Sequence, residues 1–155
     1  LPYPKLALKG LNKIIPKDLN PENKERLTNN FDASITYSRQ IGNIYTGSLY
    51  LGLLSLLEQS QDLKAGDKIG FFSYGSGAVS EIFSGRLVEG YKDLLRSDRL
   101  DTFAKRQHLS VADYEKLFYE EAQLDDTGST QFADYQTGAF RLAEISEHQR
   151  IYKGN

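Results

Sequence analysis

Gly75-Ser76-Gly77 is the local feature of the sequence best suited to chemistry. Glycines permit positive φ angles and let a ligand approach the main chain, so turn amides can point at an anion or a carbonyl oxygen. The Ser76 hydroxyl can donate to the same group. The lysine and hydroxyl residue of a P-loop are missing, and Ser80 stands where a dinucleotide fingerprint has its third glycine. A plain hairpin turn is the alternative, and on local grounds the more frequent one.

Asn43 and a row of lysines are the next candidates for binding. Asn43 stands where a helix is expected to start, so it can cap that helix, worth about 1 kcal/mol, or hold a substrate oxygen through its carboxamide. Lys5, Lys9 and Lys13 recur every four residues and therefore share one helix face. Such a face is usually only solvated, but ammonium groups at this spacing would also suit a phosphorylated ligand.

Residues for catalysis or metal binding are scarce. The sequence contains no cysteine, which excludes a disulfide, a thiolate metal site and a cysteine nucleophile. His108 and His148 lie far apart without metal-ligand spacing, so we expect no metal site. Glu81 and the pair Asp125-Asp126 are expected to be surface groups. Because no nucleophile is paired with a base, we expect no catalytic residue in this chain.

Composition limits the class of protein. The chain has 155 residues, the size of one domain or a large part of one. A net charge of −2 argues against a general nucleic-acid binder, and 39% hydrophobic residues argue against a disordered tail. No apolar run reaches the roughly 20 residues of a membrane-spanning helix, so we expect no membrane partner. The chain begins Leu1-Pro2 and lacks methionine, so we expect a fragment or a processed product.

Three helices are predicted in the first part of the chain. Apolar spacing predicts the first over 6–15, and Asn20-Pro21 is typical of a helix start, which predicts the second over 21–39. Gly42 ends the second helix. Segment 45–59 is apolar nearly all round, which predicts a helix buried against several neighbours. Small residues in it allow another backbone to approach closely: Thr46, Gly47, Ser48, Gly52 and Ser55.

The second part of the chain mixes strands with short helices. Segment 68–74 reads as a buried strand, 78–88 as a second strand, and 140–152 as a C-terminal strand with a polar bend near His148. The remaining elements are a turn at 64–67, a short helix over 91–96, a helix over 110–122 and a loop over 125–130. The last helix begins with a Ser110–Asp113 capping box and should turn Tyr114, Leu117 and Phe118 inward. This order predicts a layered α/β fold with a mixed sheet.

Two segments carry a resemblance to a known family. They are residues 37–51, YSRQIGNIYTGSLYL, and residues 69–77, IGFFSYGSG. Together they closely resemble the bacterial type of hydroxymethylglutaryl-CoA (HMG-CoA) synthase. The opening Leu1–Lys5 and the ending from Gly138 through Ile151-Tyr152 resemble the same family. The resemblance covers nearly the whole chain and is weakest over 91–137.

The resemblance implies a fold, a reaction and partners. The fold is thiolase-like, with two similar halves, each a sheet packed on a buried central helix. Residues 1–155 would be the C-terminal half, with helix 45–59 at its centre and the N-terminal half missing. The implied reaction condenses acetyl-CoA with acetoacetyl-CoA and water to HMG-CoA and CoA, in the mevalonate route to isoprenoids. The family works as a cytoplasmic homodimer without metal or organic cofactor, since CoA thioesters are its substrates.

The resemblance also implies site residues. The family's cysteine and glutamate belong to the N-terminal half, and its histidine directly precedes a segment like Leu1-Pro2-Tyr3, so none falls in this chain. Lys5 and Lys9 match positions that contact CoA, while Asn43 and Ser76 match positions at the acyl group. We therefore expect the fragment alone to be inactive. The alternatives are another thiolase-fold condensing enzyme of the ketoacyl synthase type, or a non-enzymatic acyl- or CoA-binding module.

Overall fold

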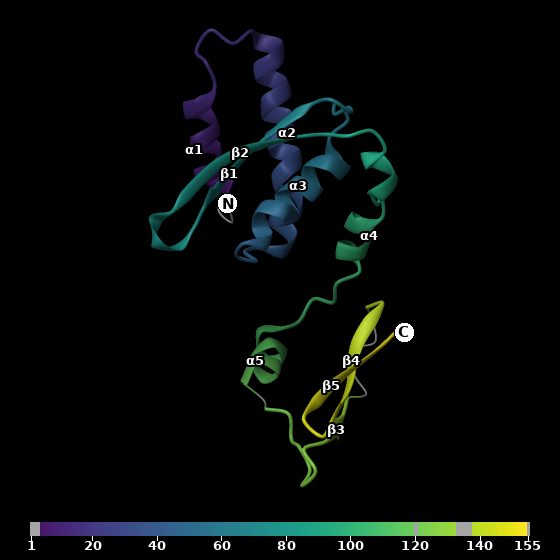
Figure 1. Ribbon diagram of the computed structural model, residues 1–155. Coiled ribbons are helices and arrows are strands. Elements are labelled where there is room, and N and C mark those ends of the chain that lie inside the picture. The colour runs from purple at the N-terminus through teal and green to yellow at the C-terminus, as the bar shows by residue number, and fades with distance from the viewer. Residues whose placement is uncertain (1–3, 120, 133–137, 155) are drawn as a thin grey trace. The chain divides into compact units, whose positions relative to one another are not determined.

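The computed structural model describes residues 4–119, 121–132 and 138–154, with Ser76 described by its backbone alone. The chain divides into two compact units, residues 1–97 and residues 98–155 (Figure 1). Unit 1 holds all four of the residues expected to bind substrate or CoA. Each unit is described by itself below.

The described residues of unit 1 form three helices followed by a β-hairpin (Figure 1). Its helices are α1 (Pro4–Ile14), α2 (Pro21–Ile41) and α3 (Gly47–Gln59), and its strands are β1 (Lys68–Tyr74) and β2 (Ser80–Arg86). Two short 3-10 turns, η1 (Ser76–Ala78) and η2 (Tyr91–Leu94), follow β1 and β2 respectively. These elements match the predicted ones closely, although α3 begins two residues later than expected.

The ends of α2 follow from local sequence. The Asn20 side chain accepts a hydrogen bond from the Asn23 backbone N–H at 2.8 Å, and Pro21 occupies the first helical position. Gly42 ends the helix with φ 82°, a left-handed conformation that glycine adopts without strain. Both predicted signals are therefore confirmed.

Helices α2 and α3 pack closely through small residues. The Ser55 hydroxyl is fully buried, donates to the Ala33 carbonyl at 2.5 Å and accepts from the Tyr37 N–H at 3.2 Å. Those two groups are i and i+4 on α2, so Ser55 engages the hydrogen-bond ladder of the neighbouring helix. A Cβ at Gly52 would lie 3.4 Å from the Ser34 carbonyl oxygen. The predicted close approach of another backbone is confirmed.

The burial of α3 differs from the prediction. Within the described part of unit 1 the helix packs against α2 and β1, and its buried residues are Ser48, Ser55 and Leu56. Tyr50 is 59% exposed. The expected burial on all sides is therefore wrong for this unit, because α2 and the hairpin cover only part of the helix circumference.

The hairpin is antiparallel over its whole length, from the pair Lys68–Arg86 to the pair Tyr74–Ser80. The rings of Phe71 and Phe83 stack across the two strands with centroids 4.7 Å apart. Strand β1 was expected to be buried, but its residues are exposed or half-buried. An antiparallel ribbon packs one face on the core and leaves the other to solvent, which explains the difference.

The described part of unit 2 contains two helices and a small sheet. The helices are α4 (Arg99–Ala104) and α5 (Val111–Tyr119); the strands are β3 (Thr130–Gln131), β4 (Phe140–Ser146) and β5 (Gln149–Gly154). The sheet order is β3-β4-β5, and both pairings are antiparallel. The predicted single C-terminal strand is thus a hairpin, whose turn contains Glu147 (φ 48°) and His148 (φ 65°).

Two further predictions need correction. The α/β class holds, but the described strands form two antiparallel sheets in place of one mixed sheet. Short turns such as those after β1 and β4 can join only antiparallel neighbours, whereas parallel strands need a crossover.

The Ser110 cap of α5 is confirmed, since its hydroxyl accepts from the Asp113 N–H at 3.1 Å. The inward orientation of Tyr114, Leu117 and Phe118 is wrong, because they are 56%, 44% and 66% exposed.

Candidate functional site

One end of unit 1 collects the segments that carry the expected site residues. Helix α1 starts there, α2 returns to it, α3 leaves from it, and β1 runs back to it before the hairpin turns (Figure 1). The first turn of α1, the α2–α3 loop and the β1–β2 turn therefore lie toward the same end. They carry Lys5, Asn43 and Ser76 respectively. No hydrogen bond or ion pair among the described residues joins the three segments to one another.

Asn43 lies in the loop between α2 and α3 and is exposed. Its Oδ1 accepts hydrogen bonds from the Tyr45 N–H at 2.7 Å and from the Ser48 hydroxyl at 3.4 Å. The expected role as helix cap is wrong, because α3 begins at Gly47 and Thr46 occupies its N-cap position. The two bonds to Oδ1 leave the carboxamide NH2 as the free end, and it contacts no acceptor among the residues described. This group is a donor suited to a carbonyl oxygen.

Ser48 holds the same loop through hydrogen bonds, and the sequence did not indicate it as a functional candidate. The residue is 3% exposed, and its hydroxyl accepts from the Ile44 N–H at 3.1 Å while donating to Asn43. The sequence identified it only as a small residue of the third helix. Its contacts depend on the path of the loop backbone, which no spacing rule predicts.

The loop backbone has an uncommon conformation. Tyr45 has φ 53°, and its side chain is 85% exposed. A non-glycine residue held in this region costs of order 1–3 kcal/mol, and it persists only where the surroundings fix it. Here the Gly47 and Ser48 N–H groups donate to the Ile44 and Tyr45 carbonyls at 3.1 and 3.0 Å. The loop is thus determined by contacts from α3.

Lys5 and Lys9 lie one turn apart on the exposed side of α1. Neither ammonium group forms an ion pair with a described residue, so both are available to an anionic ligand. The other side of α1 contributes Ala7, Gly10 and Leu11 to a cavity. The lysine row therefore faces away from the packed interior, as predicted from its spacing.

The turn that contains Ser76 is the tip of the β-hairpin. The Gly75 N–H donates to the Val79 carbonyl at 3.1 Å, and the two successive residues Gly77 and Ala78 have φ 75° and 55°. The hairpin-turn interpretation is therefore confirmed for the backbone. The side chain of Ser76 lies outside the described residues, so its expected contact with an acyl group stays a prediction.

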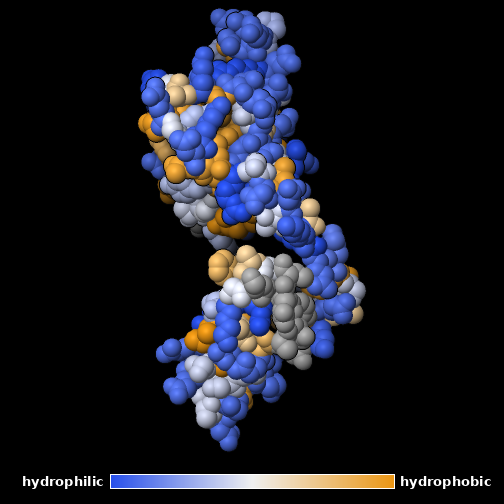
Figure 2. Space-filling view, turned by 90° about the vertical axis from the view of Figure 1, so that its right-hand side faces the viewer, coloured by the Kyte–Doolittle hydropathy of each residue, from blue (hydrophilic) through white to orange (hydrophobic). Residues whose placement is uncertain are grey.

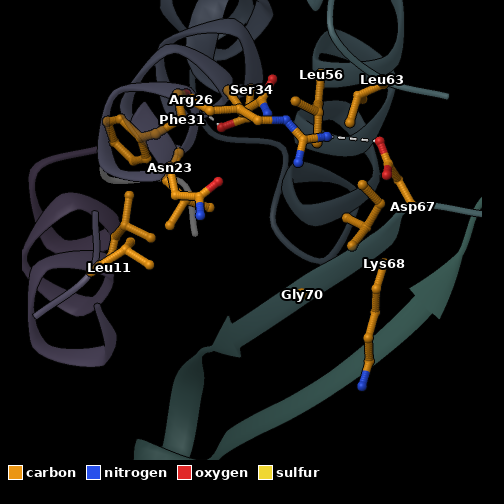
Figure 3. Close-up of a pocket in the computed structure, with 14 residues that line it drawn as sticks. Leu11, Asn23, Arg26, Phe31, Ser34, Leu56, Leu63, Asp67, Lys68 and Gly70 are labelled. Atoms are coloured by element: carbon orange, nitrogen blue, oxygen red, sulfur yellow. Dashed lines mark hydrogen bonds and ion pairs between the residues drawn. The ribbon is translucent and has the colours of Figure 1, made fainter. Parts of the chain in front are cut away.

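The described residues of unit 1 line two cavities between its helices and its hairpin. One of about 410 Å³ is bounded by α1, α2 and the start of β1, where Arg26 reaches from α2 to Asp67 at 2.8 Å (Figure 3). The other, of about 390 Å³, is lined mainly by apolar side chains and extends to Ser48. Leu27 and Phe31 line both. Apolar residues also show at the surface in the upper part of Figure 2, which is unit 1.

Perturbed carboxylates occur in unit 2. The Thr127 hydroxyl and then the Ser129 N–H lower the pKa of Asp125 by donating to its carboxylate. The Gln131 amide, followed by the charge of Lys153, lowers the pKa of Glu144. Both shifts are explained by turn and strand contacts. Over the described ranges no cluster of three His, Asp or Glu residues could hold a metal ion, and no helix is long and apolar enough to span a membrane.

Comparison with known proteins adds a family match. The family described as "Hydroxymethylglutaryl-coenzyme A synthase C terminal" matches residues 5–153. A crystal structure of HMG-CoA synthase complexed with CoA is 64% identical, with a TM-score of 0.83 over all of this chain and 40% of that chain. A crystal structure from Streptococcus mutans is 61% identical, with a TM-score of 0.81 over all of this chain and 41% of the other.

Curated relatives point the same way. Hydroxymethylglutaryl-CoA synthase of Enterococcus faecalis is 48% identical over 126 residues, which is 81% of this chain and 33% of that protein. The Saccharomyces cerevisiae enzyme is 30% identical over 152 residues, or 94% of this chain and 30% of that one. The chain thus spans about a third of the length of these curated relatives.

Proposed function

Because the chain belongs to the hydroxymethylglutaryl-CoA synthase family, as its C-terminal part, we propose that it forms the acyl- and CoA-binding side of such an enzyme. Its α/β fold is thiolase-like. The proposed reaction is an acyl transfer of the mevalonate pathway, in which acetyl-CoA and acetoacetyl-CoA condense with water to give HMG-CoA and CoA. Family membership also decides against a ketoacyl synthase.

The Asn43 carboxamide is the observation that carries this proposal. Its oxygen is held by Tyr45 and Ser48, so its NH2 group is exposed and fixed in direction. Condensation of two thioesters develops negative charge on a carbonyl oxygen, and a preoriented donor stabilises that charge more than the neutral substrate. Asn43 would therefore act at the acyl oxygen, and Ser76 would stand beside it at the hairpin turn.

Lys5 and Lys9 would hold the CoA end of the substrate. Free ammonium groups one helical turn apart suit the phosphates of CoA, and binding there would orient the acyl end for reaction. The nucleophile, the base and the polarising histidine would come from the N-terminal half, so the chain alone should not turn over. The proposal also includes that the whole enzyme works as a homodimer in the cytoplasm.

The first test replaces Asn43 in the full-length synthase that contains this chain. Asn43→Ala should lower kcat by about 10-fold or more, as for other lost oxyanion donors. Asn29→Ala is a matched control, because Asn29 is an exposed residue of α2 away from the loop. Equal kcat values for the two variants would refute the role given to Asn43. Turnover by the isolated 155-residue chain would show that the proposed division of labour is wrong.

The second test concerns the lysines. Lys5→Ala and Lys9→Ala should each raise the Kd for CoA measured by calorimetry, and the effect should shrink as salt screens the charges. Lys13→Ala is the control, since it lies on the same row about 12 Å along the helix axis from Lys5. The CoA assignment fails if all three substitutions change the Kd equally.

A further inference from the structure

We propose that Ser48 is a positioning residue, whose hydroxyl fixes the α2–α3 loop so that Asn43 presents its NH2 group to the acyl oxygen. This inference rests on the proposed function and adds a residue to the same site. Ser48 itself is 3% exposed and reaches a substrate only through Asn43.

The Ser48 hydroxyl performs two tasks that no apolar side chain can combine. It accepts from the Ile44 N–H at 3.1 Å and donates to the Asn43 Oδ1 at 3.4 Å. The second distance is long for a hydroxyl donor, so the bond to the Ile44 backbone is the stronger of the two. Ser48 therefore acts mainly by holding the backbone between Asn43 and Tyr45, and secondarily by orienting the carboxamide.

The orientation of the carboxamide decides whether it attracts or repels an acyl oxygen. With Oδ1 occupied by the Tyr45 N–H and the Ser48 hydroxyl, the NH2 end is the one left exposed. A carboxamide turned by half a rotation would offer its oxygen to the substrate oxygen, and two acceptors repel each other. Loss of the Ser48 hydroxyl weakens the preference for the productive orientation.

The strained backbone makes the loop sensitive to this contact. Tyr45 has φ 53°, and such a conformation persists only where its surroundings impose it. The Ile44 N–H lies one residue before it and relies on Ser48. Without that acceptor, the loop can relax toward an ordinary conformation and shift Asn43.

Ser55 provides a matched control on the same helix. It follows Ser48 by seven residues, or two helical turns, so both lie on one face of α3. Its buried hydroxyl bonds to the Ala33 carbonyl and the Tyr37 N–H of α2, away from the loop. Ser55→Ala thus removes an equally buried hydroxyl that stabilises the fold without touching the site.

The test compares Ser48→Ala, Ser48→Thr and Ser55→Ala in the full-length synthase. Ser48→Ala should lower kcat by about 10-fold, and by no more than Asn43→Ala does, because it misplaces the Asn43 donor, with the Kd for CoA unchanged. Ser48→Thr keeps the hydroxyl, and Ser48 lines a cavity of about 390 Å³, so this variant should retain kcat. Ser55→Ala should lower the melting temperature and leave kcat near its original value.

A double variant with Asn43→Ala distinguishes a positioning role of Ser48 from a general loss of structure. Because Ser48 acts through Asn43, the double variant Ser48→Ala/Asn43→Ala should be no slower than Asn43→Ala alone. A further loss in the double variant, or equal kcat losses in Ser48→Ala and Ser55→Ala, would overturn the positioning role.

The outcomes also distinguish this inference from the proposed function. Unchanged kcat in Ser48→Ala beside an impaired Asn43→Ala overturns the role of Ser48 alone, whereas unchanged kcat in Asn43→Ala overturns the proposed function as well. If Ser48→Ala does not fold, Ser48→Cys carries the test, because its thiol fills similar space and bonds only weakly. Its kcat should then fall between those of the original enzyme and Asn43→Ala, and an unchanged value would refute the inference.

Discussion

Tyr37→Phe isolates one hydroxyl group that ties three elements of unit 1 together. Tyr37 of α2 is 1% exposed, and its hydroxyl donates to the Glu58 Oε2 at 2.5 Å and accepts from the Gln59 side-chain amide at 3.1 Å. The other carboxylate oxygen of Glu58 accepts from the Arg96 N–H at 3.0 Å. The substitution therefore weakens the join between α2, α3 and the segment after η2.

The magnitude follows from the charge of the acceptor. A hydrogen bond to a charged group contributes about 1.5–3 kcal/mol, and the Gln59 amide also loses its acceptor, so we expect a loss of about 2–3 kcal/mol in the free energy of unfolding. Phenylalanine fills the same ring volume, so a cavity adds little to the effect. For a chain of this size the melting temperature should fall by about 4–12 °C.

Thermal melting of the 155-residue chain measures this loss, followed by far-UV circular dichroism of its helices. Tyr50→Phe is the control, because Tyr50 lies on α3, is 59% exposed and undergoes the same chemical change. It should shift stability by less than about 0.5 kcal/mol. Equal melting temperatures for the two variants would show that the Tyr37 hydroxyl does not stabilise this join.

Two further predictions concern a turn and a carboxylate. Gly66 has φ 91°, so Gly66→Ala should cost about 1–2 kcal/mol of stability. Gly70→Ala is the control and should cost nothing, because Gly70 lies in a strand and a Cβ there would meet no atom within 4 Å. Equal melting curves for the two variants would refute this prediction. The lowered pKa of Asp125 means that its contribution to stability is present above the ordinary pKa and is lost as pH falls through the lowered one. Thr127→Val removes the largest cause, so an NMR titration should show a higher pKa for Asp125, and an unmoved titration would contradict that cause.

Local signals in the sequence determined most of the secondary structure. Asn20-Pro21, Gly42 and the Ser110–Asp113 cap mark helix ends through bonds within a few residues, so the boundaries they predict hold in the structure. Strand β1 also has the predicted bounds. The motifs around Asn43 and Ser76 indicate the family from the sequence alone, because they are local runs of residue types.

Contacts between distant segments determined the rest. A periodic pattern shows that a surface is apolar but not which surface it meets. The coverage of α3, the burial of the aromatic side of α5 and the direction of strand pairing all depend on which surfaces meet. The role of Ser48 has a different origin: its contacts span no more than five residues, but they depend on a loop backbone with Tyr45 at positive φ, which no spacing rule predicts. The sequence alone therefore determined which elements form and which family they indicate. Only the tertiary structure decided which group holds Asn43 and which of its two ends faces out, because those depend on hydrogen bonds set by the path of the folded backbone.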